Sequence, residues 1–205
     1  EVVRELGDTR NAIVTIAIGD RYYKEWKEYA KPSWLLYCER YDLGLFVVKK
    51  GLIKKEHKSW KKPTWQKLLI GSSVKNMDIN INNICYLDTD IIINPLSPNI
   101  FHYHDNESIS LVSLRTDLPF SYDKTLKKIA FYRNRKISSD YPLDSALFIS
   151  LKDLYKYHDL SPQVNEACMG LIVFHVDNFY KIMESWFYKY DKEVFSITNG
   201  GARLI

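Results

Sequence analysis

One stretch of the chain points to both its fold and its chemistry: Asn83-Ile84-Cys85-Tyr86-Leu87-Asp88-Thr89-Asp90-Ile91-Ile92-Ile93-Asn94-Pro95. Residues 84–87 are apolar without alternation, which predicts a parallel strand buried on both faces of a sheet. Asp88 and Asp90 follow at the carboxyl end of that strand, where ligands bind in open α/β folds. Two carboxylates are expensive to bury there unless a cation compensates them. Their oxygens suit Mg²⁺ or Mn²⁺, and such an ion would in turn hold phosphate oxygens. A solvated, Asp-rich turn is the alternative, and the apolar residues on both sides argue against it.

The composition is that of a soluble globular protein. The 205 residues include 46% apolar and 26% charged residues, and they are too few for two ordinary domains. The net charge of +4 fits an anionic ligand but not the clustered basic face of a nucleic-acid binder. The three cysteines lie far apart, which favours buried free thiols over disulfides or zinc.

No run of 18 apolar residues and no signal-peptide pattern is present. The sequence lacks an initiator Met and stops abruptly at Ile205, so we expect a fragment or truncated form of a longer protein. We expect a cytoplasmic location, with membrane association through regions outside this sequence as the alternative.

Strands and helices alternate in the first half of the chain. We predict strands at 11–18, 43–48, 84–87, 108–113 and 170–176, an apolar run at 145–150, and helices at 22–30, 32–40, 63–76, 121–136 and 178–190. Pro32 is expected to interrupt the first helix and begin the second. The order predicts an α/β fold with a mostly parallel sheet and right-handed crossovers, in a single domain over 1–205.

Two further segments have structural rather than functional interpretations. The basic stretch 54–62 is expected to be a solvated connection. In the last predicted helix Asp177 is a good N-cap, and a stripe at helical spacing predicts a core face: Phe179, Ile182, Met183 and Trp186.

Four pieces, taken in order, resemble the nucleotide-sugar glycosyltransferases of the GT-A fold. Residues 86–92 (Tyr-Leu-Asp-Thr-Asp-Ile-Ile) are similar to the Y-L-D-A-D motif of the glycogenin-like and lipopolysaccharide-galactosyltransferase families. Residues 14–22 look like their first strand and nucleotide-binding turn, 65–69 like their W-x-K-L helix, and 168–174 like their N-x-G strand. The resemblance extends from Ala12 to about Tyr190 and implies a GT-A (Rossmann-like) domain with helices on both sides of the sheet.

The resemblance also implies roles for particular residues. Asp90 would be the direct ligand of Mn²⁺ (or Mg²⁺), while Asp88 would touch the ribose and help to hold the ion. The implied nucleotide-binding set is Ala17, Ile18, Gly19, Arg21, Tyr22, Lys67, Asp88 and Thr89. Within it the end of the first strand would meet the base, Tyr22 would stack on it, and Arg21 would reach the ribose or phosphates. The alternatives are an ordinary amphipathic tyrosine for Tyr22 and a solvated helix lysine for Lys67.

The chain departs from the family pattern at two places. The family's Asn before the Gly-hydrophobic strand aligns with Cys168, and its late metal-binding His is not recognisable before Ile205. An inverting enzyme needs a carboxylate base near the acceptor hydroxyl. Asp144 and Glu166 are the candidate catalytic acids, with solvated loop acids as the alternative for both, and retention or inversion stays open. The histidines His102, His104 and His175 are expected to be structural or solvated.

The resulting hypothesis is a metal-dependent glycosyltransferase with a UDP-sugar donor and a carbohydrate, lipid-linked or protein acceptor. Two alternatives stay open. The first is a Mg²⁺-dependent phosphatase of the haloacid-dehalogenase type, in which the first Asp of D-x-D is the nucleophile. The second is a binding domain that keeps the fold without turnover.

Overall fold

The computed structural model describes residues 1–124, 127, 151–157, 159–163 and 167–189. The chain forms two compact units. The first unit is Glu1–Ser110 with Gly170–Lys189, and the second is Leu111–Met169 with Tyr190–Ile205. In the second unit the described residues include helix α6 (Leu151–Tyr157), which the sequence patterns did not predict. The single domain over 1–205 stays a prediction.

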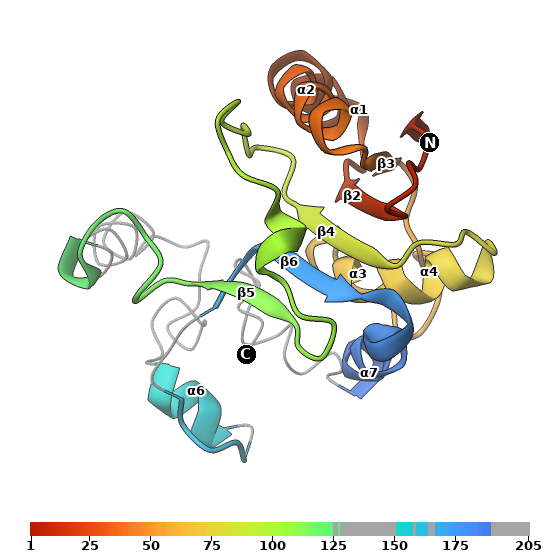
Figure 1. The fold of residues 1–205 in the computed structure, drawn as a ribbon. Coiled ribbons are helices and arrows are strands. Elements are labelled where there is room, and N and C mark those ends of the chain that lie inside the picture. The colour runs from red at the N-terminus through yellow and green to blue at the C-terminus, as the bar shows by residue number, and fades with distance from the viewer. Residues whose placement is uncertain (125–126, 128–150, 158, 164–166, 190–205) are drawn as a thin grey trace. The chain divides into compact units, whose positions relative to one another are not determined.

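The described residues form a six-stranded sheet in the order β1-β3-β2-β4-β6-β5 (Figure 1). The strands are β1 (Val2–Arg4), β2 (Asn11–Ile16), β3 (Gly44–Val48), β4 (Asn83–Leu87), β5 (Ser110–Ser113) and β6 (Ala167–His175). Strand β2 runs parallel to both β3 and β4, whereas β1 is antiparallel to β3 and β6 is antiparallel to β4. The α/β class is therefore confirmed. The sheet is mixed, with a parallel centre of three strands, and β1 was not predicted.

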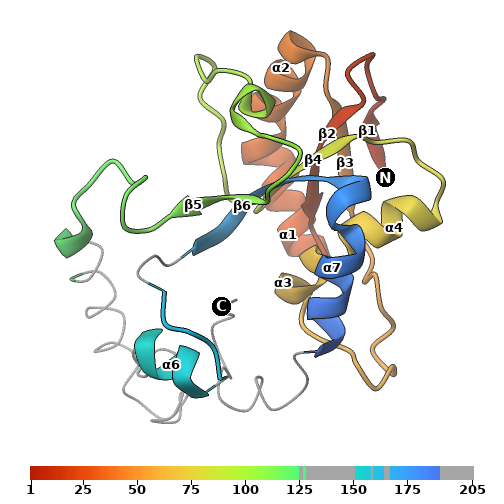
Figure 2. The same cartoon turned by 60° about the horizontal axis from the view of Figure 1, so that its bottom comes forward.

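Helices of the first unit lie on both faces of this sheet (Figure 2). They are α1 (Asp20–Glu25), the π-helical turn η1 (Trp26–Ala30), α2 (Lys31–Tyr41), α3 (Pro63–Gln66), the 3-10 turn η2 (Lys67–Leu69), α4 (Ile70–Asn76), the 3-10 turn η3 (Ile100–Tyr103) and α7 (Val176–Lys189). Helices α1 and α2 cover one face, while α4 and α7 pack together on the other.

A new helix, α2, begins at Lys31 with Pro32 in its first turn, as predicted, but η1 and α2 follow α1 without a gap, so the helical run is not broken there. Proline has no N–H to donate to the carbonyl four residues earlier. The chain meets this deficit with the wider π turn that ends at Ala30, just before α2 begins. The expected interruption is thus a change of helix type.

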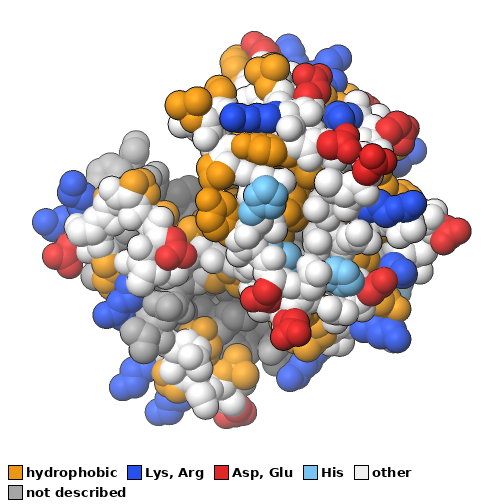
Figure 3. All heavy atoms as spheres, in the orientation of Figure 1, with side chains coloured by type: hydrophobic (Ala, Val, Ile, Leu, Met, Phe, Trp, Pro, Cys, Tyr) orange, Lys and Arg blue, Asp and Glu red, His pale blue; other side chains and the backbone are white. Residues whose placement is uncertain are grey.

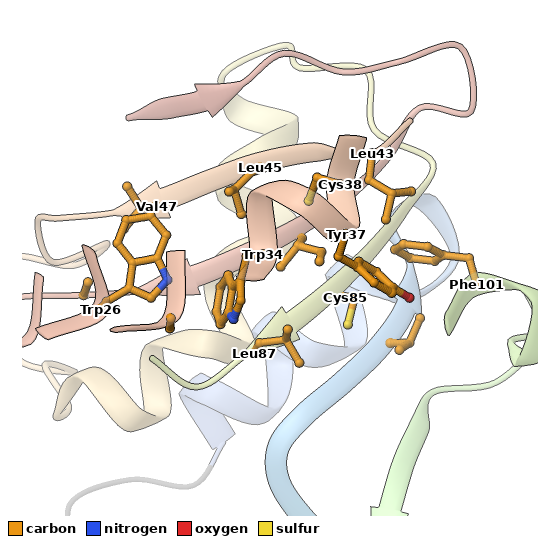
Figure 4. Close-up of a cluster of buried hydrophobic side chains, with 14 residues drawn as sticks. Trp26, Trp34, Tyr37, Cys38, Leu43, Leu45, Val47, Cys85, Leu87 and Phe101 are labelled. Carbon is orange, nitrogen blue, oxygen red and sulfur yellow. The ribbon is translucent and has the colours of Figure 1, made fainter. Parts of the chain in front are cut away.

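The core between the sheet and α2 is built on large aromatic side chains (Figure 4). Trp26 and Trp34 meet edge to face with ring centroids 5.8 Å apart, and both are buried. From β4, Cys85 and Leu87 point into this cluster. All three cysteines are free, as predicted, but only Cys38 and Cys85 are buried, and Cys168 is half-buried. Burial raises the pKa of the Cys38 thiol to about 12.

The core face of α7 differs from the predicted stripe. Met183 is buried as expected, but Val176 and Phe187 complete the buried face, and Ile182 is 45% exposed. The helix begins at Val176, so Asp177 lies in its first turn and is not its N-cap. A methyl group on Gly71 of α4 would come within 2.9 Å of Cβ of Tyr180, so the close packing of these two helices requires glycine there.

The solvated connection predicted for 54–62 is wrong at its end. Lys61 is 1% exposed, and its ammonium donates to the Phe187 carbonyl near the end of α7. The Lys61 carbonyl in turn accepts from Nε2 of Gln66 at 2.9 Å. This lysine is an anchor between the connection and α7.

Candidate functional site

A cavity of about 770 Å³ opens where β2 and β4 end. We call it the edge cavity. Four segments of the first unit line it: the end of β2, one side of α1 and η1, the start of α3, and the turn after β4. Its lining residues are Ile16, Ile18, Tyr22, Glu25, Tyr29, Ala30, Lys62, Pro63, Thr64, Tyr86, Asp88, Thr89, Asp90 and Ile92.

Backbone hydrogen bonds hold the D-x-D turn at the edge of the sheet. The amide of Asp88 donates to the Gly170 carbonyl at 2.9 Å, which continues the pairing of β4 with β6. The amide of Ile91 then donates to the Asp88 carbonyl at 3.2 Å and closes the turn. From β2, Oγ1 of Thr15 donates to the Leu87 carbonyl at 2.7 Å. The last residue of β4 is therefore fixed from both sides.

The Asp88 carboxylate has two partners, both on Oδ1. The Tyr86 hydroxyl donates to it at 2.6 Å, and the Lys67 ammonium lies 3.3 Å from it. Burial, together with the nearby charges of Asp88 and Asp90, raises the pKa of Tyr86 well above its usual value, so this hydroxyl keeps its proton. The Lys67 side chain is only 5% exposed, whereas that of Asp88 is 40% exposed.

Lys67 lies behind Asp88 and is not among the residues that line the edge cavity. The alternative of a solvated lysine is therefore wrong. Its ammonium also lies 4.6 Å from the centroid of the Tyr86 ring. Direct contact of Lys67 with a ligand stays a prediction.

Asp90 and Thr89 both line the edge cavity, and Asp90 is exposed. Two carboxylates at a cavity wall fit a hard cation such as Mn²⁺ or Mg²⁺, which takes the rest of its ligands from water and phosphate. Among the described residues, no cluster of three or more His, Cys, Asp or Glu side chains could hold a metal ion.

The end of β2 contributes only part of the expected nucleotide contacts. Ile18 and Tyr22 line the cavity, and Tyr22 is 59% exposed. Ala17 is buried, with its amide donating to the Val48 carbonyl at 2.9 Å, and Gly19 adopts φ 99° just before α1. Arg21 does not line the cavity, but its guanidinium is paired at 2.8 Å with Glu25, which does.

Of the predicted site, the structure thus brings five residues to one cavity: Ile18, Tyr22, Asp88, Thr89 and Asp90. Ala17, Gly19, Arg21 and Lys67 do not line it. The candidate catalytic acids Asp144 and Glu166 lie outside the described residues.

Several residues at the cavity were missed by sequence reasoning. Glu25 and Tyr29 follow the predicted Tyr22 at positions i+3 and i+7, a spacing that places all three on one helix face. This spacing was the available signal. Lys62 was included in the solvated connection, although Pro63 directly after it marks the start of a helix that brings both residues to the cavity.

Comparisons with known proteins add little to this geometry. No protein-family model and no curated protein matches the chain. One similar solved structure is described as a "glycosyltransferase involved in the glycosylation of the major capsid of PBCV-1". It is 12% identical with a TM-score of 0.36, over 85% of this chain and 99% of that chain. A likeness at this level carries no argument about activity, which must be argued from the site.

Among the helices of the described residues, none is both long enough and apolar enough to cross a bilayer.

Proposed function

We propose that this chain transfers a sugar from a nucleotide diphosphate sugar to an acceptor hydroxyl, with the help of a divalent cation. One observation carries the proposal: Asp88 and Asp90 share a cavity with the end of β2 and the exposed face of α1. That is the carboxyl edge of the parallel strands, where open α/β sheets bind ligands. UDP is the proposed nucleotide by family resemblance, and Mn²⁺ or Mg²⁺ the proposed ion.

The edge cavity has the size and lining for such a donor. Its volume of about 770 Å³ is within the range of small-molecule sites. Tyr22 and Tyr29 offer exposed aromatic faces on which a base can stack. Lys62 supplies positive charge at the same cavity, as a diphosphate requires.

Asp88 and Asp90 would hold the cation, which, when bound, neutralises the diphosphate leaving group. Tyr86 and Lys67 fix the Asp88 carboxylate in one orientation through Oδ1. Of the two D-x-D carboxylates, Asp88 has its charge offset by Lys67, whereas no described residue forms an ion pair with Asp90. We therefore expect weak metal binding until the nucleotide adds its own oxygens.

Asp144 or Glu166 remains the proposed catalytic carboxylate that serves the acceptor or the donor sugar. The acceptor class is carbohydrate, lipid-linked or protein. Replacing both acids by alanine should abolish turnover while leaving nucleotide binding intact. Unchanged turnover would remove this assignment.

The phosphatase alternative requires Asp88 as nucleophile. Here Oδ1 of Asp88 already accepts from Tyr86 and lies against Lys67, which suits a carboxylate that is held in place. We therefore keep the glycosyltransferase as the proposal.

The deciding experiment is a thermal-shift panel of nucleotides and nucleotide sugars, with and without Mn²⁺. We expect UDP with Mn²⁺ to raise the melting temperature and either one alone to raise it less, because a ligand stabilises the state that binds it. Hydrolysis of p-nitrophenyl phosphate with Mg²⁺, without any nucleotide-dependent shift, would support the phosphatase instead.

A further inference from the structure

A second cavity of the first unit, about 460 Å³ in volume, lies beside the D-x-D turn on the face of the sheet that packs against α2. We call it the apolar cavity. Its floor is made by sheet residues that are at most 3% exposed: Ile13, Cys85 and Leu87. Leu171 of β6 and Ile91 and Ile100 from the segment after the turn line it as well.

No charged side chain lines this cavity among the residues that the structure describes. Burial raises the pKa of the Cys85 thiol, so this group too remains neutral. An ion or a phosphate would therefore meet no opposite charge among these residues, whereas an alkyl or aromatic group would be removed from water against a mainly apolar lining.

The cavity is preformed, because α2 holds the segment above it in place. We call residues 91–100 the strap. Five side chains of α2 bond to its backbone at 2.7–3.1 Å: Ser33 to the Ile93 amide, Trp34 to the Ile91 carbonyl, Tyr37 to the Pro98 carbonyl and the Ile100 amide, Arg40 to the Pro95 carbonyl, and Tyr41 to the Ser97 carbonyl. A ligand that enters such a site does not have to order the loop around it.

The apolar cavity adjoins the edge cavity. Ile92 lines both of them, and it follows Asp90 by two residues. The side chain is 68% exposed, so it is accessible to a ligand from solvent. Figure 3 shows hydrophobic side chains gathered over the strap. Tyr103 lines the apolar cavity as well, and because it is 72% exposed we place it at the rim.

We propose that the apolar cavity is an acceptor subsite, and that the acceptor carries an alkyl or aromatic group close to the hydroxyl that receives the sugar. This inference rests on the proposed function. The apolar group fills the cavity under the strap, and the hydroxyl lies across Ile92 toward the donor site at Asp88 and Asp90.

The test compares two probes that share a sugar and differ in the tail: n-octyl β-D-glucopyranoside, below its micelle concentration, and methyl β-D-glucopyranoside. Binding to the full chain is measured by isothermal titration calorimetry. We expect the octyl probe to bind at least about tenfold more tightly, with a negative heat-capacity change from apolar burial.

Two variants locate the binding. Tyr103→Asp places a charge at the rim of the apolar cavity and should weaken octyl binding by about tenfold. Leu96→Asp is the matched control, since Leu96 is on the same strap and 83% exposed but lines neither cavity. Ile100→Trp, which fills the cavity from its wall, should also weaken octyl binding.

Three outcomes would overturn the inference. Equal binding of the two probes would show that the cavity does not bind the octyl tail. No binding of the octyl probe would show the same, since the chain's own residues would then fill the cavity. Octyl binding unchanged in both Tyr103→Asp and Ile100→Trp would place the tail elsewhere.

The thermal shift with UDP and Mn²⁺ is recorded on the same samples and separates the two proposals. Loss of octyl binding with an intact shift refutes the subsite alone, whereas octyl binding at the cavity without any shift refutes the proposed function and the acceptor role with it.

Discussion

The edge cavity and the apolar cavity share Ile92 but are built in different ways. At the edge cavity the side chains with functional chemistry are held by other side chains: Asp88 is oriented by Tyr86 and Lys67. At the apolar cavity the polar side chains of α2 bind the backbone of the strap, and the apolar side chains are left to face the cavity. A charged site therefore depends on a few individual contacts, whereas an apolar site depends on the position of a whole segment.

This difference predicts which changes affect one cavity and spare the other. Asp90→Asn should have the largest effect. It removes one carboxylate charge from the edge cavity, and a charged contact is worth about 1.5–3 kcal/mol, or roughly 10- to 100-fold in affinity. We expect the thermal shift with UDP and Mn²⁺ to be lost while octyl glucoside binding is unchanged.

Asp78→Asn is the matched control for this change, because Asp78 is exposed, lines neither cavity, and has φ 55°, which asparagine tolerates. A full nucleotide shift in Asp90→Asn would contradict the metal role of the motif.

Tyr37→Phe should affect the apolar cavity instead. The Tyr37 hydroxyl donates to the Pro98 carbonyl and accepts from the Ile100 amide, both at 2.8 Å, so its loss leaves two backbone groups without this partner. We expect a loss of about 1–3 kcal/mol in the free energy of unfolding, measured by urea denaturation, and weaker octyl binding. Burial raises the pKa of Tyr37 to about 12, so the effect should be constant across physiological pH.

Tyr41→Phe is the graded comparison, since it removes a single bond, to the Ser97 carbonyl. Its expected loss is smaller, about 0.5–1.5 kcal/mol. Equal losses in both variants would show that the strap does not depend on the double contact of Tyr37.

Lys67→Met tests the charge compensation at Asp88. Because the Asp88 side chain is 40% exposed, its pair with Lys67 is worth only about 0.2–1 kcal/mol. We expect Mn²⁺ to bind the nucleotide-free variant roughly two- to fivefold more tightly, by calorimetry, since a competing cation is removed.

The control is Lys75→Met, which removes a lysine paired with Asp177, away from both cavities. Weaker Mn²⁺ binding in Lys67→Met would mean that Lys67 serves mainly to orient Asp88.

The smallest effect is expected from the pH dependence of stability at His104. His104 follows Tyr103, and its Nδ1 lies 2.8 Å from Oγ of Ser110. Burial lowers the pKa of His104, and the nearby His175 lowers it further, while Asp105 opposes this. The unfolded chain therefore takes up the proton first, and the contribution of His104 to stability is lost as the pH falls below about 6.5.

Urea midpoints at pH 7.5 and 5.5 check this prediction. The decrease should be smaller in His104→Gln than in the exposed control His102→Gln. The same decrease in both variants would assign the pH dependence to other groups.

Sequence reasoning succeeded where the pattern is local. Continuous apolar runs predicted β2, β3 and β4, and the abrupt change from Leu87 to Asp88 placed the carboxylates at the end of β4. It failed at Lys61, because the partner of that ammonium is the Phe187 carbonyl, 126 residues away. Nothing in the basic stretch itself distinguishes this lysine from its solvated neighbours.

The sequence by itself determined the α/β class, the strand that carries Asp88 and Asp90, and the carboxyl edge at which they lie, since these depend on periodicity and on neighbouring residues. Only the tertiary structure decided that Lys67 lies behind Asp88, that Tyr29 and Lys62 join the edge cavity, and that α2 holds the strap above an apolar cavity. Those features arise from side chains that meet across tens of residues, and their contacts exist only once the helices have packed onto the sheet.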